Sequence, residues 1–384
     1  MRKVFVLLLA VLSLTLFIGC NGETSSTTTT TADGTATTDP FEGEKIVLIT
    51  DKGDITDKSF NQGAYEGVQN YATEMGIEYG YLKPTDATDA YYISAIETAI
   101  NDGATVIVTP GYLFEPAINI VQSQFPDVKF ILLDGNPANA TDGTLGENVY
   151  SIFYAEEQVG FLAGYVAVME GWRHLGFMGG MAVPAVQRYG HGYVQGAAKA
   201  AEELGLAADA ITIEYLYTGD FVASPEVQAA AATMYSNGVD VIFACGGAVG
   251  QSVMAAAAKA GDKHVIGVDV DQSADSPTVV TSAMKSLSLS VEQALQAIYE
   301  DGTWEEDFGG VSVILGAAEG GIGMPEDFSK FDNFTKADYD SLFAKLVDAT
   351  YTVSSVIGAF GDDGTASKQF ETTQVKVNVI IFEG

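Results

Sequence analysis

Short runs of consecutive apolar residues recur along the chain from about residue 45, and most are followed by a polar turn and a longer stretch with apolar residues three and four positions apart. A short continuous apolar run is typical of a strand buried on both faces, and the longer spacing is typical of a helix with one buried side. The first predicted strands are 46–49, 78–82, 105–109, 128–133 and 149–154, and the first predicted helices are 59–75, 89–101 and 114–125. This alternation predicts an α/β fold with a doubly wound parallel sheet.

The alternation starts again after residue 155, so the sequence predicts a second doubly wound lobe of similar size. Its predicted helices are 156–169, 185–204, 224–236 and 250–260, and its predicted strands are 174–178, 211–215, 239–244 and 264–268. Later elements, predicted at 278–282, 287–299, 310–315 and 336–349, cross back between the lobes and indicate a hinge. The alternating tail at 368–382 predicts an edge strand, and the sequence does not identify its partner.

The amino terminus has the pattern of a targeting segment. Arg2 and Lys3 precede an apolar run at 4–18 that is too short for a comfortable membrane span. Residues 17–20 at the end of this run, with Cys20 as the last, resemble a bacterial lipobox with phenylalanine in place of the usual leucine. The alternative is an ordinary secretory signal. The Ser/Thr-rich stretch 21–39 predicts a flexible tether. We therefore expect a signal peptide at 1–19, a lipidated cysteine and disordered linker at 20–44, an N-terminal lobe at 45–154 plus about 286–312, a C-terminal lobe at 155–285 plus about 313–360, and a C-terminal strand extension at 361–384.

Composition narrows the range of partners. The chain of 384 residues carries 51 acidic and 18 basic residues, a net charge of −33, which argues against nucleic acid as a partner. Cys20 and Cys245 are the only cysteines and suggest no disulfide framework. Cys245 ends an apolar run, so we expect a buried free thiol. The three histidines at positions 174, 191 and 264 are scattered without metal-ligand spacing, and we expect no metal and no cofactor.

Polar residues gather where the predicted strands end. Asp51, Asp134 and Asp269 each directly follow an apolar strand, and so does the pair Gly246-Gly247. Ligands in open α/β sheets bind outside the carboxyl ends of the strands. If both sheets face one cleft between hinged lobes, these residues line that cleft.

The first strand-to-helix turn is the richest of these places. It contains three carboxylates, one aromatic ring and one amide, namely Asp51, Asp54, Asp57, Phe60 and Asn61. A ring beside several oriented acceptors suits a flat, polyhydroxylated ligand. The alternative is local, because Asp57 or Ser59 could simply cap the following helix.

Several stretches, in order, resemble the "basic membrane protein" family of bacterial lipoproteins, which includes the purine nucleoside receptors of ABC transporters. They are TDKGDITDKSFNQGAYEG, VKFILLDG, QVGFLAGYVA, PAVQRYGHGYVQGA, VIFACGG, VIGVDVDQS and VVTSAMKS, and the match spans about Ile46 to Ala349. The resemblance implies a type I periplasmic-binding-protein-like fold with three hinge crossovers. The acidity of this chain departs from the family name.

In the nucleoside receptors of that family, the base lies between two aromatic rings, and acidic and amide groups hold its edge and the ribose. The resemblance implies that Phe60 and Tyr189 are the two rings, with Tyr189 where phenylalanine is usual, a change that would affect the choice of base. It implies further ligand contacts at Asp51 and Asn61 in the polar cluster of the first turn, at Asp134 for the base, at Asp269 and Asp271 for the ribose, and at Lys285 near the sugar, to which the strand-end position adds Gly246.

The interpretation that follows is an extracytoplasmic, lipid-anchored solute-binding protein, expected to be monomeric, that captures a purine nucleoside and delivers it to the permease of an ABC transporter. The chain lacks a glycine-rich phosphate loop and its candidates are mostly acidic, which favours a nucleoside over a nucleotide. An alternative is an enzyme, because Asp51, Asp54 and Asp57 resemble the acidic motifs of Ca²⁺-dependent nucleoside hydrolases. A third possibility is a sensor with the same fold.

Overall fold

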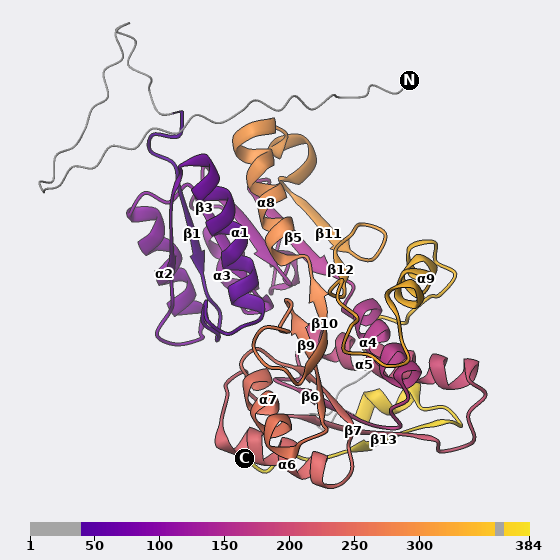
Figure 1. The fold of residues 1–384 in the computed structure, drawn as a ribbon. Helices are drawn as coiled ribbons and strands as arrows, with labels where there is room; N and C mark the ends of the chain where they lie inside the picture. The colour runs from indigo at the N-terminus through magenta and orange to yellow at the C-terminus, as the bar shows by residue number, and fades with distance from the viewer. Residues whose placement is uncertain (1–39, 358–364) are drawn as a thin grey trace, which may run out of the picture. The chain divides into compact units, whose positions relative to one another are not determined.

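A computed structural model describes residues 40–357 and 365–384 (Figure 1). The expected signal peptide 1–19, Cys20 and most of the linker 20–44 lie outside the described residues, as does part of the extension 361–384. Within the described ranges, no helix is both long enough and apolar enough to cross a membrane.

The first sheet has six strands in the order β11-β5-β4-β3-β1-β2, and every pair is parallel. Its strands are β1 (Lys45–Ile49), β2 (Glu78–Leu82), β3 (Val106–Pro110), β4 (Lys129–Leu133), β5 (Val149–Tyr154) and β11 (Val311–Leu315). Its helices are α1 (Phe60–Met75), α2 (Asp89–Asn101), α3 (Glu115–Val121) and α8 (Leu287–Gln296). Although α8 comes more than 200 residues later in the chain, it packs directly against α1 (Figure 1). We call this unit the N-terminal lobe.

The second sheet has seven strands in the order β12-β10-β9-β8-β6-β7-β13, with only the short β12 antiparallel. Its strands are β6 (His174–Gly179), β7 (Ile211–Tyr217), β8 (Val241–Cys245), β9 (His264–Asp269), β10 (Val279–Lys285), β12 (Ile322–Gly323) and β13 (Val375–Val379). Its helices are α4 (Glu156–Glu170), α5 (Pro184–Glu203), α6 (Pro225–Ser236), α7 (Val249–Ala260) and α9 (Lys336–Val347). We call this unit the C-terminal lobe.

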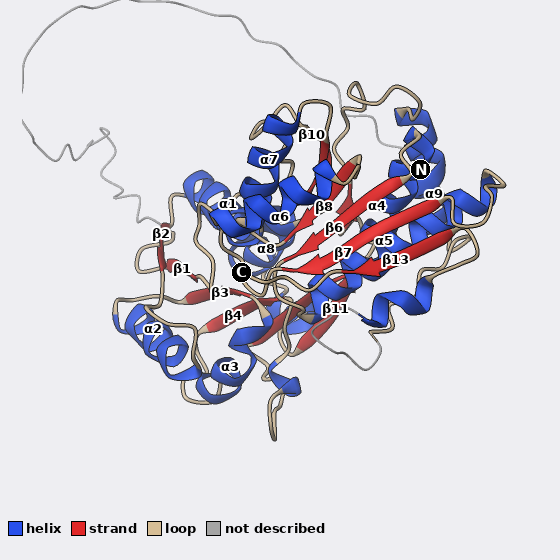
Figure 2. Ribbon diagram, turned by 90° about the horizontal axis from the view of Figure 1, so that it is seen from below, coloured by secondary structure: helices blue, strands red, loops and turns tan. Residues whose placement is uncertain are grey.

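Within residues 40–357 and 365–384, the chain passes between the two lobes three times: from β5 to α4, from β10 to α8, and from β11 to β12. The predicted two-lobed α/β fold with parallel sheets is therefore confirmed. The structure also identifies the partner of the predicted edge strand, since β13 pairs in parallel with β7, with Val375 opposite Ile211 (Figure 2).

Helices α4 and α5 cross with their backbones in contact. Each presents two glycines four residues apart, Gly160 and Gly164 on α4 and Gly192 and Gly196 on α5. A Cβ atom added to Gly164 would lie 2.0 Å from the carbonyl oxygen of Tyr193. The crossing therefore requires residues without a side chain, and it fixes the start of α5, where five cavity-lining residues lie.

Candidate ligand-binding site

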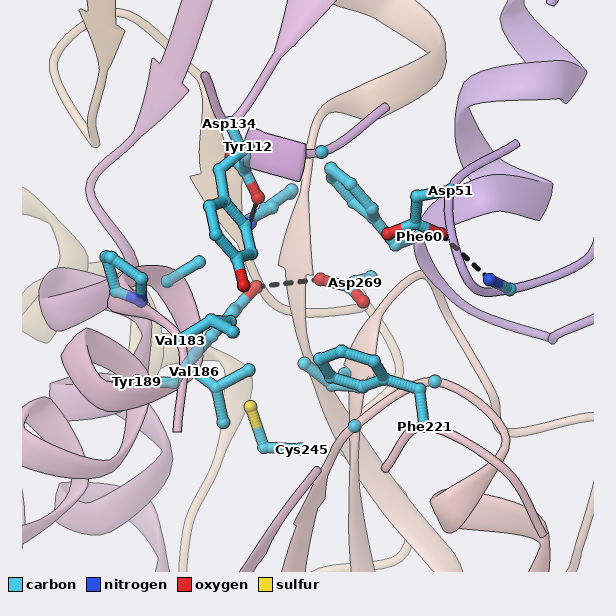
Figure 3. A pocket seen from close by; sticks show the side chains of 18 of the residues that line it. Asp51, Phe60, Tyr112, Asp134, Val183, Val186, Tyr189, Phe221, Cys245 and Asp269 are labelled. Carbon is cyan, nitrogen blue, oxygen red and sulfur yellow. Dashed lines mark hydrogen bonds and ion pairs between the residues drawn. The ribbon is translucent and has the colours of Figure 1, made fainter. Parts of the chain in front are cut away.

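A cavity of about 260 Å³ lies where the carboxyl ends of strands from both sheets meet (Figure 3). It is lined by eight of the nine residues predicted to bind ligand: Asp51, Phe60, Asn61, Asp134, Tyr189, Gly246, Asp269 and Lys285. The ninth, Asp271, is exposed and accepts a hydrogen bond from the backbone N–H of Ser273 at 2.9 Å, and it is not among the lining residues.

The first turn of the N-terminal lobe is held by Asp57, which caps α1. Its carboxylate accepts backbone hydrogen bonds from Ser59 (2.8 Å), Asn61 (3.0 Å) and Gln62 (3.1 Å). Burial raises the pKa of Asp57 to about 6, against the opposing effect of these donors. Ser59 occupies the N-cap position, but its hydroxyl donates across the lobes to Asp269 Oδ2. Of the two candidate caps, Asp57 does the capping, and Ser59 joins the lobes.

The amide of Asn61 orients the neighbouring carboxylates. Its Nδ2 donates to Asp51 Oδ1 at 3.0 Å and to Asp57 Oδ2 at 2.9 Å, while its Oδ1 accepts from the N–H of Asp51 at 3.3 Å. The third acid of this turn, Asp54, instead pairs with Lys83 at 2.7 Å. Asp51 and Asp57 therefore share the Asn61 amide, whereas Asp54 belongs to a separate ion pair, so the three acids do not form the single cluster that a shared Ca²⁺ site would need.

Aromatic rings surround the cavity. Phe60 comes from the N-terminal lobe and Tyr189 from the C-terminal lobe, as the resemblance implies (Figure 3). The Tyr189 hydroxyl donates to Asp269 Oδ1 at 3.2 Å. Two further rings, Tyr112 and Phe221, also line the cavity. Sequence reasoning missed both, although Tyr112 directly follows the strand-ending Pro110-Gly111 turn and could have been found by the rule that identified the aspartates.

A buried charge cluster forms one wall. The ammonium of Lys285 lies 2.5 Å from Asp134 Oδ2 and 2.9 Å from Glu156 Oε1, and Arg188 Nε lies 2.6 Å from Glu156 Oε2. The same ammonium lies 5.0 Å from the ring centroid of Phe60 and 5.4 Å from that of Tyr189. Lys285 thus contacts groups of both lobes. Sequence reasoning missed Glu156 and Arg188, since each looks like an ordinary polar residue near the start of a helix.

Burial sets the protonation of this cluster. It raises the pKa of Asp134 to about 7, against the attraction of Lys285. Burial alone would also raise the pKa of Glu156, but Lys285 and Arg188 bring it below its ordinary value. Burial would lower the pKa of Lys285, but Asp134 and Glu156 hold it above its ordinary value. The lysine therefore stays charged, Glu156 stays ionised, and Asp134 is the member that can gain a proton near neutral pH.

Two of the strand-end aspartates have a strained backbone. Asp134 has φ 54° and Asp269 has φ 66°, in the left-handed region that non-glycine residues seldom adopt. Such strain persists where surrounding contacts over-determine the conformation, and it concentrates at binding sites. Here each carboxylate is held by a group from the other lobe, Lys285 for Asp134 and Ser59 for Asp269.

The predicted buried thiol is confirmed, because Cys245 is free and only 1% exposed. It also lines the cavity, beside Val186 and Tyr189 (Figure 3). Burial raises the pKa of the Cys245 thiol well above its ordinary value, so the group is an uncharged part of the wall.

Known proteins resemble this chain in sequence and in fold. The family model described as "ABC transporter substrate-binding protein PnrA-like" (Bmp) matches residues 44–379. Basic membrane protein A1 of Borrelia garinii is 28% identical over 89% of this chain and 94% of its own. The ABC transporter nucleoside-binding protein BmpA of Lactococcus lactis is 27% identical over 92% of this chain and 99% of its own.

Among solved structures, a solute-binding protein of an ABC transporter system from Aeropyrum pernix matches with a TM-score of 0.64 and 23% identity, covering 85% of this chain and 90% of the other. One from Conexibacter woesei matches with a TM-score of 0.64 and 24% identity, covering 81% and 98%. These structures support the fold alone. The family match covers nearly all of the described chain, including both lobes and every cavity-lining segment, and the chain therefore belongs to the Bmp family of PnrA-like ABC transporter substrate-binding proteins.

Proposed function

We propose that this substrate-binding protein captures purine nucleosides in the cavity between its lobes and delivers them to the permease subunits of an ABC transporter. The observation that carries the proposal is the convergence of rings and carboxylates from both lobes on one cavity. The protein of Lactococcus lactis that is named as nucleoside-binding supports the same ligand class.

The rings suit the base. A nucleobase offers two flat faces, and stacking on an aromatic side chain is worth about 1–3 kcal/mol per base. Phe60, Tyr112, Tyr189 and Phe221 provide aromatic surface from both lobes. A two-ring purine covers more of that surface than a pyrimidine does, which favours purines.

The charges suit a nucleoside without a phosphate. Five carboxylates line the cavity, namely Asp51, Asp57, Glu115, Asp134 and Asp269. The two lining cations, Lys285 and Arg188, are already paired with buried acids. Carboxylates accept well from ribose hydroxyls and from the N–H groups of a base, whereas a phosphate would meet repulsion.

The remaining expectations belong to the same proposal. Cys20 carries the lipid that anchors the protein on the outer side of the cell membrane, the stretch 20–44 is a tether, and the two lobes act as a hinged monomer. The apolar run at 4–18, which is followed by Gly19 and Cys20, supports the anchor. The variant Cys20→Ala should be released from the membrane by detergent-free washing, and retention there would point to a different anchor.

Calorimetric titration tests the ligand class. The parent protein should bind adenosine, guanosine or inosine more tightly than uridine. Phe60→Ala should weaken binding of every nucleoside by about 1–3 kcal/mol, or roughly five- to 150-fold. The matched control is Tyr81→Ala, since Tyr81 is 43% exposed and is not among the lining residues.

Tyr81→Ala should bind as the parent does. A Phe60→Ala variant that also binds like the parent would remove the stacking role. A parent protein that binds a free sugar but none of the nucleosides would overturn the ligand class and leave only the binding fold. Release of free ribose from inosine in the presence of Ca²⁺ would instead support the hydrolase alternative.

A further inference from the structure

One buried amide joins the two lobes without lining the cavity. The side chain of Gln272, which is only 1% exposed, belongs to the C-terminal lobe. Its Nε2 donates to the backbone carbonyl of Lys58 in the N-terminal lobe at 2.6 Å. Its Oε1 accepts a hydrogen bond from the backbone N–H of Val268 at 3.2 Å. The backbone N–H of Gln272 donates to Ser282 Oγ at 3.1 Å. The amide is therefore fixed from the C-terminal lobe and aimed at the other.

The segment that Gln272 contacts is the turn that carries Phe60. Lys58 has φ 61°, a strained conformation for a residue with a side chain. Its ammonium lies 3.5 Å from Asp275 in the C-terminal lobe, and the next residue, Ser59, donates its hydroxyl to Asp269. Lys58 and Ser59 of the N-terminal lobe thus contact residues 269–275 of the C-terminal lobe through three interactions. Those of the Ser59 hydroxyl and of the Gln272 amide are more buried than the ion pair of Lys58 with Asp275.

We propose that Gln272 is a positioning residue that holds the lobes closed around the cavity and sets ligand affinity through closure. Gln272 is not one of the lining residues, so it acts on a ligand through the turn that it docks. If only the closed form binds tightly, the apparent dissociation constant equals the intrinsic constant divided by the closed fraction. Loss of the amide donor lowers that fraction in the ligand-free protein.

The structure offers a reporter of closure that needs no ligand. Cys245 is buried but lines the cavity, so separation of the lobes opens a path to its thiol. Its rate of modification by a bulky maleimide, followed by peptide mass spectrometry on the full chain, measures the open fraction and separates Cys245 from Cys20. Gln272→Met keeps the length of the side chain and removes the donor. Gln272→Asn keeps an amide that is one methylene too short to reach the carbonyl of Lys58 while bonding Val268.

The matched control is Gln195→Met. The amide of Gln195 bonds within the C-terminal lobe, to the backbone carbonyl of Ser354 at 3.0 Å and its N–H at 2.9 Å, so its loss tests general loosening of that lobe. Removal of one buried hydrogen bond should raise the ligand-free labelling rate of the Gln272 variants roughly threefold to tenfold. Gln195→Met should label at the parent rate.

The ligand readout rests on the proposed function. In Gln272→Met the dissociation constant for a nucleoside should rise by the factor by which the closed fraction falls, which is smaller than the rise in labelling while the closed form predominates. Saturating nucleoside should return labelling to the slow parent rate. Labelling that is equal in the parent and both ligand-free Gln272 variants would overturn the proposal whether or not a nucleoside binds. Weakened binding with unchanged ligand-free labelling would also overturn it, because that result identifies a direct ligand contact. If nucleosides fail to bind the parent, the labelling comparison still tests closure and only the proposed function falls.

Discussion

Replacement of Lys285 by methionine would remove the buried cation at the centre of the site while keeping most of its volume. The side chain of Lys285 is 2% exposed, and its ammonium pairs with Asp134 and Glu156, whose side chains are 9% and 0% exposed. Methionine fills the space of the lysine stem but leaves both acids without this partner. Glu156 keeps Arg188 at 2.6 Å, so the uncompensated group is Asp134.

Breaking a buried ion pair from one side costs about 3–5 kcal/mol, because the remaining charge stays in the low-dielectric interior. We expect Lys285→Met to lose this amount of unfolding free energy at pH 8. The pKa of Lys285 is raised in the fold, so its contribution is fully present below its ordinary pKa and does not change between pH 5.5 and 8.

The pH dependence comes from Asp134. Its pKa is raised to about 7, so the folded protein binds more protons than the unfolded chain, and stability falls as the pH rises from about 4 to about 7. Without Lys285 this pKa rises further, and the fall extends to higher pH. The cost of Lys285→Met should therefore be about 1–2 kcal/mol smaller at pH 5.5 than at pH 8.

Urea unfolding of the two proteins at pH 5.5 and pH 8 measures these costs. Adding Asp134→Asn to Lys285→Met should recover stability at pH 8, because it removes the unpaired charge and leaves the pair of Glu156 with Arg188. The matched control is Lys336→Met, since Lys336 pairs with Asp340 at 2.5 Å with its side chain 36% exposed, and the loss of such an exposed pair should change the unfolding free energy little. Two results would contradict this expectation: Lys285→Met lowering the unfolding free energy no more than the control does, or the added Asp134→Asn lowering it further.

Two more changes test the helix pair behind the site. Gly164→Ala should destabilise the fold by about 1–3 kcal/mol, because the added Cβ would lie 2.0 Å from the Tyr193 carbonyl oxygen, and the melting temperature should fall. The control is Gly80→Ala, where the added Cβ has nothing within 4 Å and the melting temperature should not fall for this reason. Equal effects of the two changes would contradict the close crossing. Burial raises the pKa of Glu157 to about 7, so its ionisation lowers stability as the pH rises from about 4 to about 7. Glu157→Gln should therefore raise the unfolding free energy at pH 8 by about 2 kcal/mol, seen as a higher urea midpoint, and leave it nearly unchanged at pH 5. An equal increase in unfolding free energy at both pH values would show that the pKa of Glu157 is not raised.

Local patterns predicted most elements of this fold, because apolar runs and helical spacing are properties of neighbouring residues. Helix α2 was expected at 89–101 and is found at Asp89–Asn101, and β5 was expected at 149–154 and is found at Val149–Tyr154. The partner of β13 was not predictable, since Val375 pairs with Ile211, 164 residues earlier in the chain, and an edge strand carries no signal of its neighbour.

The site shows the same division between local and distant information. The rule that ligands bind at the carboxyl ends of parallel strands predicted that Asp51, Asp134 and Asp269 line one cavity, and they do. It could not decide whether Asp57 or Ser59 caps α1, because the answer depends on Asp269, 210 residues away, which takes the Ser59 hydroxyl. The buried position of Lys285 depends in the same way on an acid that lies 151 residues earlier in the chain.

The same kind of contact between the lobes occurs twice, and in each case a side chain of one lobe binds an aspartate at a strand end of the other. Asp134 directly follows β4 of the first sheet, and its carboxylate is bound by Lys285 from the end of β10 in the second sheet. Asp269 ends β9 of the second sheet, and its carboxylate is bound by Ser59 at the start of α1 in the N-terminal lobe. Both aspartates have positive φ, and each carboxylate is contacted by a group from the other lobe, while Asp269 also accepts a hydrogen bond from Tyr189 of its own lobe. Separation of the lobes would therefore remove the Lys285 contact of Asp134 and the Ser59 contact of Asp269, and leave Asp269 bound to Tyr189.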